Sequence, residues 1–227
     1  KALLIGTTPS NENFLGRIDD VQVVASNLDA AGVATLMGGS VRTPAADTHV
    51  SAEAFARNFN YGGATLMQLK YPPDIRPLVR FDLSAVPAGT PIKRAILSFH
   101  VQDSVIISPG LKAYAYPLTE SWLEGTQNGA VSTLGATWSK RQIGPDLAWS
   151  GAGGTFYNVA AGVFQVPLGA TPQRYWEMDI TSTVKEWVDG VRANHGLTLL
   201  LDFSLDSANL SSRESPRLEP RLVISTQ

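Results

Sequence analysis

A short amphipathic helix inside a strand-rich sequence is the feature that most constrains this fold. Four apolar residues follow the spacing i, i+3, i+4, i+7, which places them on one face of a helix: Val184, Trp187, Val188 and Val191. Asp179 or Thr181 can cap the first turn of this helix, and Gly190 can end it. A helix with one apolar face needs an apolar surface to pack on. The sequence therefore predicts one short helix lying on a β-sheet.

Alternation of apolar and polar residues marks the strands of that sheet. Residues 95–102 carry apolar side chains at the odd positions and mostly polar ones at the even positions, which is the period of a half-buried strand. Turn sequences rich in Gly and Pro separate this segment from others of the same kind, at 65–71, 78–83, 111–116 and 197–203. The 227 residues include 20 Gly and 14 Pro, which favours many turns. The pattern predicts an all-β fold.

Composition excludes several classes of function. The net charge of −2 gives no reason to expect nucleic acid as a partner. No apolar run approaches the roughly 20 residues that span a bilayer, so we expect no membrane insertion. The chain has no cysteine and therefore no disulfide or thiolate metal site. Because it begins at Lys1 without a signal peptide, we expect a processed form or a fragment of a larger protein.

The chain divides near its beginning. Residues 38–40 read Gly-Gly-Ser and predict a linker between a segment at 1–37 and a domain at 41–227. Residues 123–170 are irregular and rich in Gly, as expected for long loops at one end of a β-sandwich. Such loops are where function tends to concentrate.

Six short motifs along the larger part of the chain form an ordered set, at 46–50, 58–62, 79–84, 92–97, 118–122 and 136–138. They include an Asn-Tyr-Gly turn, an Arg-Phe-Asp-Leu strand and a Glu-Ser-Trp/Thr-Trp pair, and the helix and closing strand complete them. Residues 41–227 thereby resemble the DNRLRE domain, also described as carbohydrate-binding module family 96. The resemblance implies an antiparallel β-sandwich of jelly-roll type. It also implies an extracellular or cell-surface setting, in a non-catalytic glycan-binding or adhesion module of a larger secreted protein.

The first 37 residues carry a second resemblance. The segments at 3–6, 14–23 and 28–37 resemble the C-terminal end of a concanavalin A-like, or laminin-G-like, jelly roll. Two strands with open edges are marginal alone and need a partner strand. The alternative function is therefore a structural subunit of an extracellular fibre, sheath or surface layer, in which copies of the chain pair through β-strands.

Tryptophan and basic side chains are the candidate carbohydrate-binding residues. Sugar rings stack on exposed indole faces. Among the tryptophans, Trp149 lies in the Gly-rich insertion and is the best candidate for exposure, whereas packing within the protein is the favoured alternative for Trp122 and Trp138. Lys140 and Arg141 follow Trp138, and with Lys93 and Arg94 they would suit the carboxylates of an acidic polysaccharide such as alginate. A solvated loop is the alternative for these cations.

Carboxylates near the matched motifs are the candidate metal ligands. Jelly-roll modules often hold a structural Ca²⁺, which prefers several oxygen ligands. Asp47 and Asp179 are the first candidates among the carboxylates of these motifs, the others being Asp82, Asp202 and Glu214. The alternative for Asp179 is a helix cap.

Catalysis has little support. The chain lacks the His-Glu-x-x-His, Gly-x-Ser-x-Gly and Gly-x-x-x-x-Gly-Lys motifs. Glu120 and Glu124 are close in sequence, and paired carboxylates hydrolyse glycosides at the right separation, which the sequence does not give. A polysaccharide hydrolase or lyase is therefore the disfavoured third hypothesis, and we expect a protein that is not an enzyme.

Overall fold

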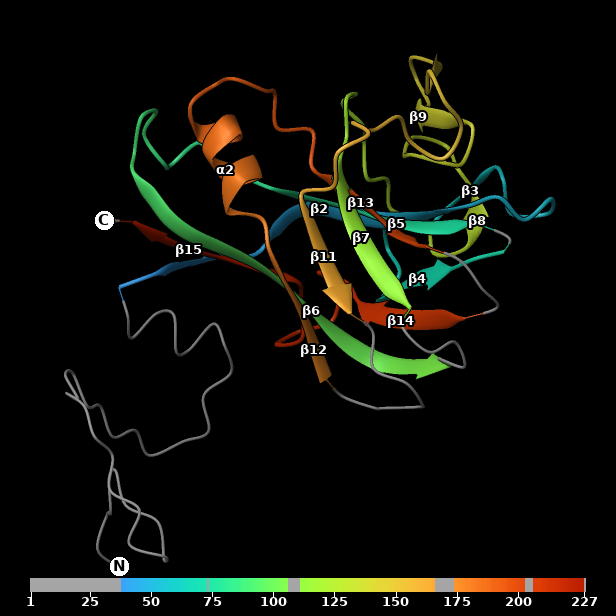
Figure 1. The fold of residues 1–227 in the computed structure, drawn as a ribbon. Helices are drawn as coiled ribbons and strands as arrows, with labels where there is room; N and C mark the ends of the chain where they lie inside the picture. Colours follow the sequence, from blue (N-terminus) through green and yellow to red (C-terminus); the bar gives the residue numbers. More distant parts are fainter. Residues whose placement is uncertain (1–37, 73, 106–110, 166–173, 203–205, 227) are drawn as a thin grey trace, which may run out of the picture.

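The computed structural model describes residues 38–72, 74–105, 111–165, 174–202 and 206–226. These residues form a curled, mostly antiparallel β-sheet with one short helix, as in an all-β sandwich (Figure 1). The predicted all-β class is confirmed. The laminin-G-like segment at 1–37 lies outside the described residues. Within the described part of the chain, no helix is long and apolar enough to cross a bilayer.

Eleven strands make up the main sheet. Nine of them follow one path in the order β1-β15-β6-β14-β4-β5-β13-β7-β11, while β12 pairs with β6 and β2 pairs with β5. Their bounds are β1 Ser40–Arg42, β2 Pro44–Ser51, β4 Leu66–Lys70, β5 Ile75–Phe81, β6 Ile92–Val105, β7 Lys112–Pro117, β11 Gly162–Gln165, β12 Arg174–Asp179, β13 Leu197–Leu201, β14 Ser207–Ser211 and β15 Arg221–Thr226. Strand β1 begins at Ser40, the last residue of the predicted linker at 38–40.

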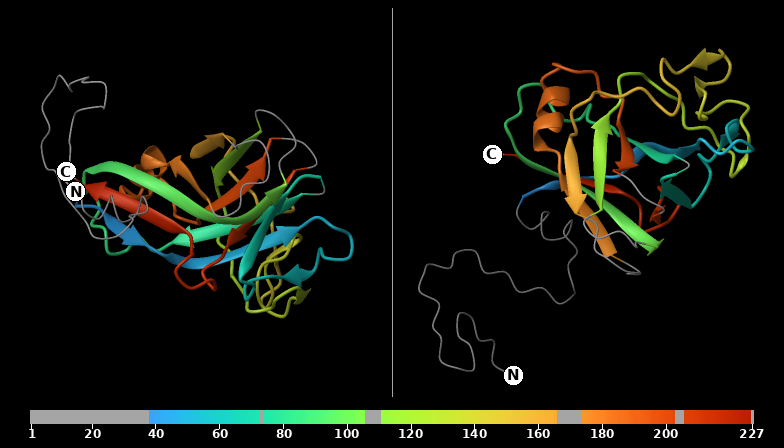
Figure 2. Two further views of the ribbon diagram at one scale, coloured as in Figure 1. Left: turned by 90° about the horizontal axis from the view of Figure 1, so that it is seen from below. Right: turned by 45° about the vertical axis from the view of Figure 1, so that its right-hand side comes forward.

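Strand β6 joins the two halves of the curled sheet. Its first residues pair with β15, its middle pairs with β12, and its last residues pair with β14. It appears as the long, curved green ribbon in Figure 2. The main apolar core lies inside this curl and includes Phe99, Trp176 and Met178. Burial of large apolar side chains here is the main source of stability.

The predicted alternation along residues 95–102 is confirmed on its apolar face, where Ala95, Leu97, Phe99 and Val101 are buried. The alternation predicts that the polar face of this strand is exposed. Ser98 and His100 on that face are instead buried. Neighbouring side chains cover that face, because the His100 ring packs edge-on against Tyr175 and bonds the Ser211 hydroxyl at 2.9 Å.

Helix α2 (Thr181–Val188) lies on the sheet as predicted (Figure 1). Val184, Trp187 and Val188 are buried in the main core. The prediction that Val191 shares this stripe is wrong, since Val191 is exposed. The helix ends before it, and Gly190 has a φ of +70°, a left-handed conformation that terminates helices.

A second apolar cluster lies apart from the main core, beneath the long connection between β7 and β11. It consists of Ala46, Val50, Leu78, Leu118, Trp122, Ala136, Trp138 and Trp149. Short strands organise the loops above it: β3 (Phe59–Asn60) pairs with β8 (Ala130–Val131), and β9 (Lys140–Gln142) pairs with β10 (Leu147–Ala148). The irregular Gly-rich segment is therefore a folded cap with its own core.

Candidate functional site

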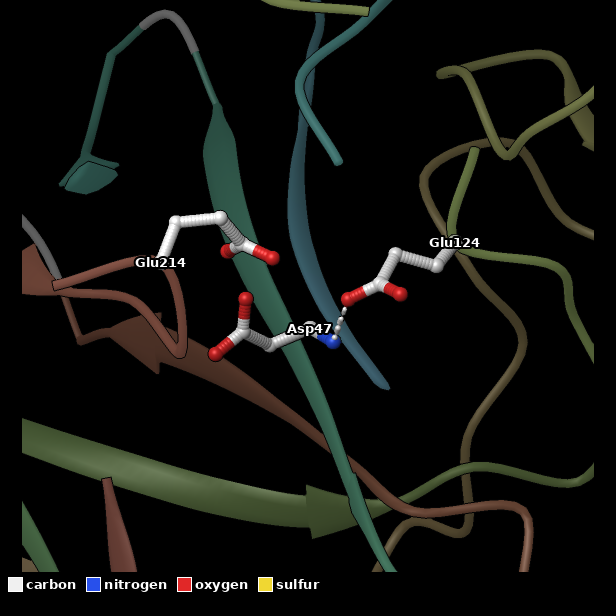
Figure 3. A group of neighbouring side chains, drawn as sticks. All are labelled: Asp47, Glu124 and Glu214. Atoms are coloured by element: carbon white, nitrogen blue, oxygen red, sulfur yellow. Dashed lines mark hydrogen bonds between the residues drawn. The ribbon is translucent and has the colours of Figure 1, made fainter. Parts of the chain in front are cut away.

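Three carboxylates from distant parts of the chain meet at one edge of this cap (Figure 3). Asp47 comes from β2, Glu124 from the loop after β7, and Glu214 from the connection between β14 and β15. One oxygen from each lies within 4.8 Å of the others. We call Asp47, Glu124 and Glu214 the carboxylate triad.

Among the described residues, Arg213 is the cation that forms hydrogen bonds with the triad carboxylates. Its backbone N–H donates to Asp47 Oδ2 at 2.8 Å, and its Nη1 donates to Glu124 Oε2 at 2.9 Å. Glu124 Oε1 also accepts the backbone N–H of Asp47 at 2.7 Å. Asp47 Oδ1 accepts no hydrogen bond from any described residue, although Asp47 is only 1% exposed. A buried carboxylate oxygen without a donor is costly unless something else satisfies it.

Electrostatics in the triad favour neutralisation of Asp47. Burial raises the pKa of Asp47 to about 8, with a further upward contribution from the charges of Glu214 and Glu124, against the hydrogen bond from Arg213. Burial also raises the pKa of Glu124. The site therefore disfavours three free negative charges, and either a proton or a cation would relieve it.

Asn60 holds the loop that carries Glu124. Its side chain is fully buried, and its Nδ2 donates to the carbonyls of Glu124, at 2.6 Å, and Ala136, at 2.9 Å. Its Oδ1 accepts the backbone N–H groups of Gly62 and Gln127, each at 3.2 Å. All four hydrogen-bonding positions of the amide are used, so Asn60 fixes Glu124 relative to β2.

A polar pocket lies beside the triad. Asp47, His49 and Ser51 are alternate residues of β2 and share one face of that strand. The pocket has a volume of about 320 Å³ and is lined by His49, Ser51, Glu53, Tyr61, Ala64, Thr65, Leu66, Gln68, Ile75, Asn128 and Asn209. Most of these side chains carry a hydroxyl or an amide, and few are charged. We call this the polar pocket.

An aromatic pair forms part of the polar pocket. The rings of His49 and Tyr61 stack with centroids 3.9 Å apart. Burial lowers the pKa of His49 to about 3, and its Nδ1 accepts the backbone N–H of Gln68 at 3.4 Å, so the ring is neutral. Tyr61 is half-buried. Its ring is therefore held in place by His49 while part of it remains accessible.

Several polar groups of the pocket are open to a ligand. Within the described residues, the side-chain amides of Gln68 and Asn128 and the hydroxyl of Tyr61 make no hydrogen bond, while Gln68 and Tyr61 are half-buried and Asn128 is exposed. Glu53, the pocket's carboxylate, pairs with Lys70 at 3.4 Å. The Asn209 amide donates to Asp103 at 2.8 Å. The pocket thus offers both donors and acceptors with little net charge.

The prediction that Trp149 offers an exposed platform is wrong. Trp149 is 6% exposed, and its indole N–H donates to the Thr137 carbonyl at 3.0 Å. Trp122 and Trp138 are also buried in the second cluster, the favoured alternative for them. The guanidinium groups of Arg80 and Arg76 lie over their rings, at 5.6 and 5.0 Å from the centroids. These indoles hold the cap together and offer no open face for a sugar.

A conservative substitution tests this structural role. Trp149→Phe should lower the free energy of unfolding by about 1–3 kcal/mol, because the buried Thr137 carbonyl loses its donor and the smaller ring leaves a gap. Denaturant unfolding measures this directly. The control is Phe55→Leu at a 73% exposed position, where a change below about 0.5 kcal/mol is expected. Equal effects of the two variants would contradict the assignment.

The predicted basic cluster does not assemble. Lys140 pairs with Asp146 at 2.8 Å, and Arg141 donates to the carbonyl and hydroxyl of Ser121 at 2.9 and 3.1 Å. Strand β9, which carries both, and the beginning of β6, which carries Lys93 and Arg94, lie at opposite ends of the molecule (Figures 1 and 2). Because these cations are separated or bonded within the protein, they form no common surface for an acidic chain.

The two predicted calcium ligands, Asp47 and Asp179, lie in different parts of the fold. Asp47 belongs to the triad, but Asp179 does not. Asp179 Oδ1 accepts the N–H of Thr181 at 3.0 Å at the start of α2, and its carboxylate pairs with Arg94 at 3.6 Å. Burial tends to raise the pKa of Asp179, but the hydrogen bonds from Thr181 and the charge of Arg94 outweigh it and lower the pKa. Asp179 therefore lies apart from the triad. The prediction that Asp179 or Thr181 caps α2 is wrong, because the N-cap residue is Ile180 and no side chain makes a capping hydrogen bond there.

The two acids considered for hydrolysis have different hydrogen-bond partners. Glu120 accepts hydrogen bonds from the N–H and hydroxyl of Ser150, at 3.0 and 2.9 Å. Glu124 instead belongs to the triad. The two carboxylates therefore hold different loops.

Comparison with known proteins adds no family. No protein-family model matches the chain, and no match is found among the curated proteins. The DNRLRE resemblance therefore rests on its ordered motifs alone.

Sequence reasoning missed most residues of the polar pocket. In the sequence, Tyr61 stands out only within a turn motif and Asn209 only within a weak glycosylation pattern, and no pattern marks Gln68 or Asn128 as binding residues. One signal was present, since Asp47, His49 and Ser51 alternate along a predicted strand and place polar groups on one face. The partners of that face come from β4, β14 and a loop, and only the fold brings them together.

Proposed function

We propose that this domain is a non-catalytic glycan-binding module and that the polar pocket is its saccharide site. The observation that carries the proposal is the half-buried Tyr61 ring, braced by His49, beside amides that have no partner among the described residues. Sugars present hydroxyls that both donate and accept, together with apolar C–H faces. A partly accessible aromatic ring beside side-chain amides matches both properties.

The charge of the pocket favours a neutral saccharide. Glu53 is the carboxylate that lines it, and the nearby cation, Lys70, is paired with that carboxylate. An acidic chain would place its own carboxylates against Glu53, which is unfavourable. The proposal therefore replaces the acidic polysaccharide expected from Lys140 and Arg141 with a neutral one. The extracellular or cell-surface setting implied by the resemblance remains part of this proposal.

Gln68 offers a clean test of the site. Gln68→Ala should weaken binding of a neutral oligosaccharide by about 3- to 10-fold, because it removes one or two hydrogen bonds from a half-buried surface position. Isothermal titration calorimetry against xylan, mannan and β-glucan oligosaccharides, with oligoalginate in parallel, measures the change. Gln142→Ala on β9 is the matched control and should bind as the wild type does. A loss of affinity in the control but not in Gln68→Ala would refute the site.

Assembly is the second candidate, favoured by one observation. Strand β1 lies at the end of the sheet path and pairs on one side with β15. It directly follows the segment for which a partner strand is expected, so this edge could template pairing between copies. Light scattering with and without EDTA tests it. Polymers would favour a structural subunit, and a monomer would leave the glycan-binding module as the proposal.

A further inference from the structure

We infer that the carboxylate triad is a divalent-cation site, suited to Ca²⁺, that ties two loops to strand β2. The ligands are Asp47, Glu124 and Glu214, from three segments that are remote in sequence. This inference is independent of the saccharide proposal, because it rests on the triad alone.

The number and type of the ligands fit Ca²⁺. One oxygen from each of the three carboxylates lies within 4.8 Å of the others, so a single cation could contact all three. Ca²⁺ takes six to eight oxygen ligands and is commonly held by several carboxylates, whereas Mg²⁺ is usually bound by one or two. Figure 3 shows the three carboxylates turned toward a common space.

The charges and hydrogen bonds of the carboxylate triad favour a bound cation. Three carboxylates face one guanidinium, that of Arg213, so two negative charges stay uncompensated when all are ionised. The Arg213 side chain bonds Glu124, whereas its contact with Asp47 comes from the backbone N–H. Asp47 Oδ1, in a side chain only 1% exposed, is left without a donor in the described part of the chain. A bound cation would satisfy that oxygen and neutralise the site.

The cation would fix the geometry of the cap and the pocket together. Asp47 is separated from Glu124 by 77 residues and from Arg213, the neighbour of Glu214, by 166. One ion joining these segments closes long loops, which stabilises the folded state against the unfolded chain. The Glu214 loop also bonds the chain beside the polar pocket, where the hydroxyls of Ser212 and Ser215 donate to the carbonyls of Ala64 and Thr65.

Calcium chloride titrated into EDTA-treated, desalted protein tests the inference. Calorimetry should detect one ion per chain, bound more tightly than Mg²⁺. At about 100 times the dissociation constant, Ca²⁺ should raise Tm by roughly 5–10 °C. The proposal is overturned if the wild type neither binds Ca²⁺ nor gains thermal stability from it.

Three isosteric variants locate the site. Asp47→Asn, Glu124→Gln and Glu214→Gln should each weaken Ca²⁺ binding at least about 10-fold and reduce the Tm shift. Glu214 is partly exposed on a loop, so that variant keeps the test valid even if a change at buried Asp47 disturbs folding. Asp179→Asn is the matched control and should bind Ca²⁺ as the wild type does. Binding that survives in Glu214→Gln but is lost in Asp179→Asn would overturn the assignment.

Discussion

Asn60→Ala should lower the free energy of unfolding by about 3–6 kcal/mol. The substitution strands the carbonyls of Glu124 and Ala136 and the N–H groups of Gly62 and Gln127. Each buried group left without a partner costs about 1–3 kcal/mol, and the four are not fully additive because they share one cavity. Urea unfolding followed by tryptophan fluorescence measures the change.

Asn60→Ala should also change how the thermal stability of the protein responds to Ca²⁺. Since Asn60 positions the Glu124 loop, the variant should also lose most of its Ca²⁺-dependent rise in Tm. Asn158→Ala is the control, because Asn158 is exposed in the same cap and should change stability by less than about 0.5 kcal/mol. Similar unfolding curves for the two variants would show that the amide of Asn60 does not hold the loop.

Gly196→Ala should be at least as damaging, with a loss of about 4 kcal/mol or failure to fold. Gly196 has a φ of +86°, where an L side chain costs about 1–2 kcal/mol. A methyl group there would collide with the Val79 carbonyl and lie 2.9 Å from Arg80 Cβ and 3.0 Å from Arg80 Cα. These atoms belong to the interior strand β5 and have little room to move.

The matched control for this substitution is Gly89→Ala. Gly89 has a φ of +75°, but no atom lies within 4 Å of the position a methyl group would occupy. Only the backbone cost of about 1–2 kcal/mol should remain. Thermal unfolding of both variants separates strain from collision, and equal losses of stability would contradict the close packing of Gly196 on β5.

The fold could be predicted from the sequence where a periodic pattern of apolar residues corresponds to one buried face of a strand or helix. Residues 95–102 alternate because one face of β6 lies on the main core, and the stripe of α2 is helical because the sheet lies beneath it. Val191 fits the same spacing but is exposed, since periodicity alone does not show where a helix ends. The buried Ser98 and His100 were missed for a related reason, because strands and side chains from elsewhere cover the second face.

The candidate site was harder to predict because its parts are remote in sequence. Asp47 was identified, but its partners follow it by 77 or more residues and lie in loops without a regular pattern. Trp149 was misplaced because a Gly-rich segment resembles an open loop, whereas this one covers a second apolar cluster. Three of the eight buried residues of that cluster are tryptophans, so these indoles form a core and not a binding surface.

A titration of isotope-labelled protein with a neutral oligosaccharide, followed by backbone and side-chain amide NMR shifts, tests the saccharide site directly. We expect shifts centred on Tyr61, Gln68, Asn128 and Asn209, with those of Lys140 and Arg141 unchanged. The side-chain amide signals of Gln68 and Asn128 should move most, because both are open to the pocket. Shifts centred on β9, or no shift with any saccharide tested, would show that the polar pocket is not a saccharide site.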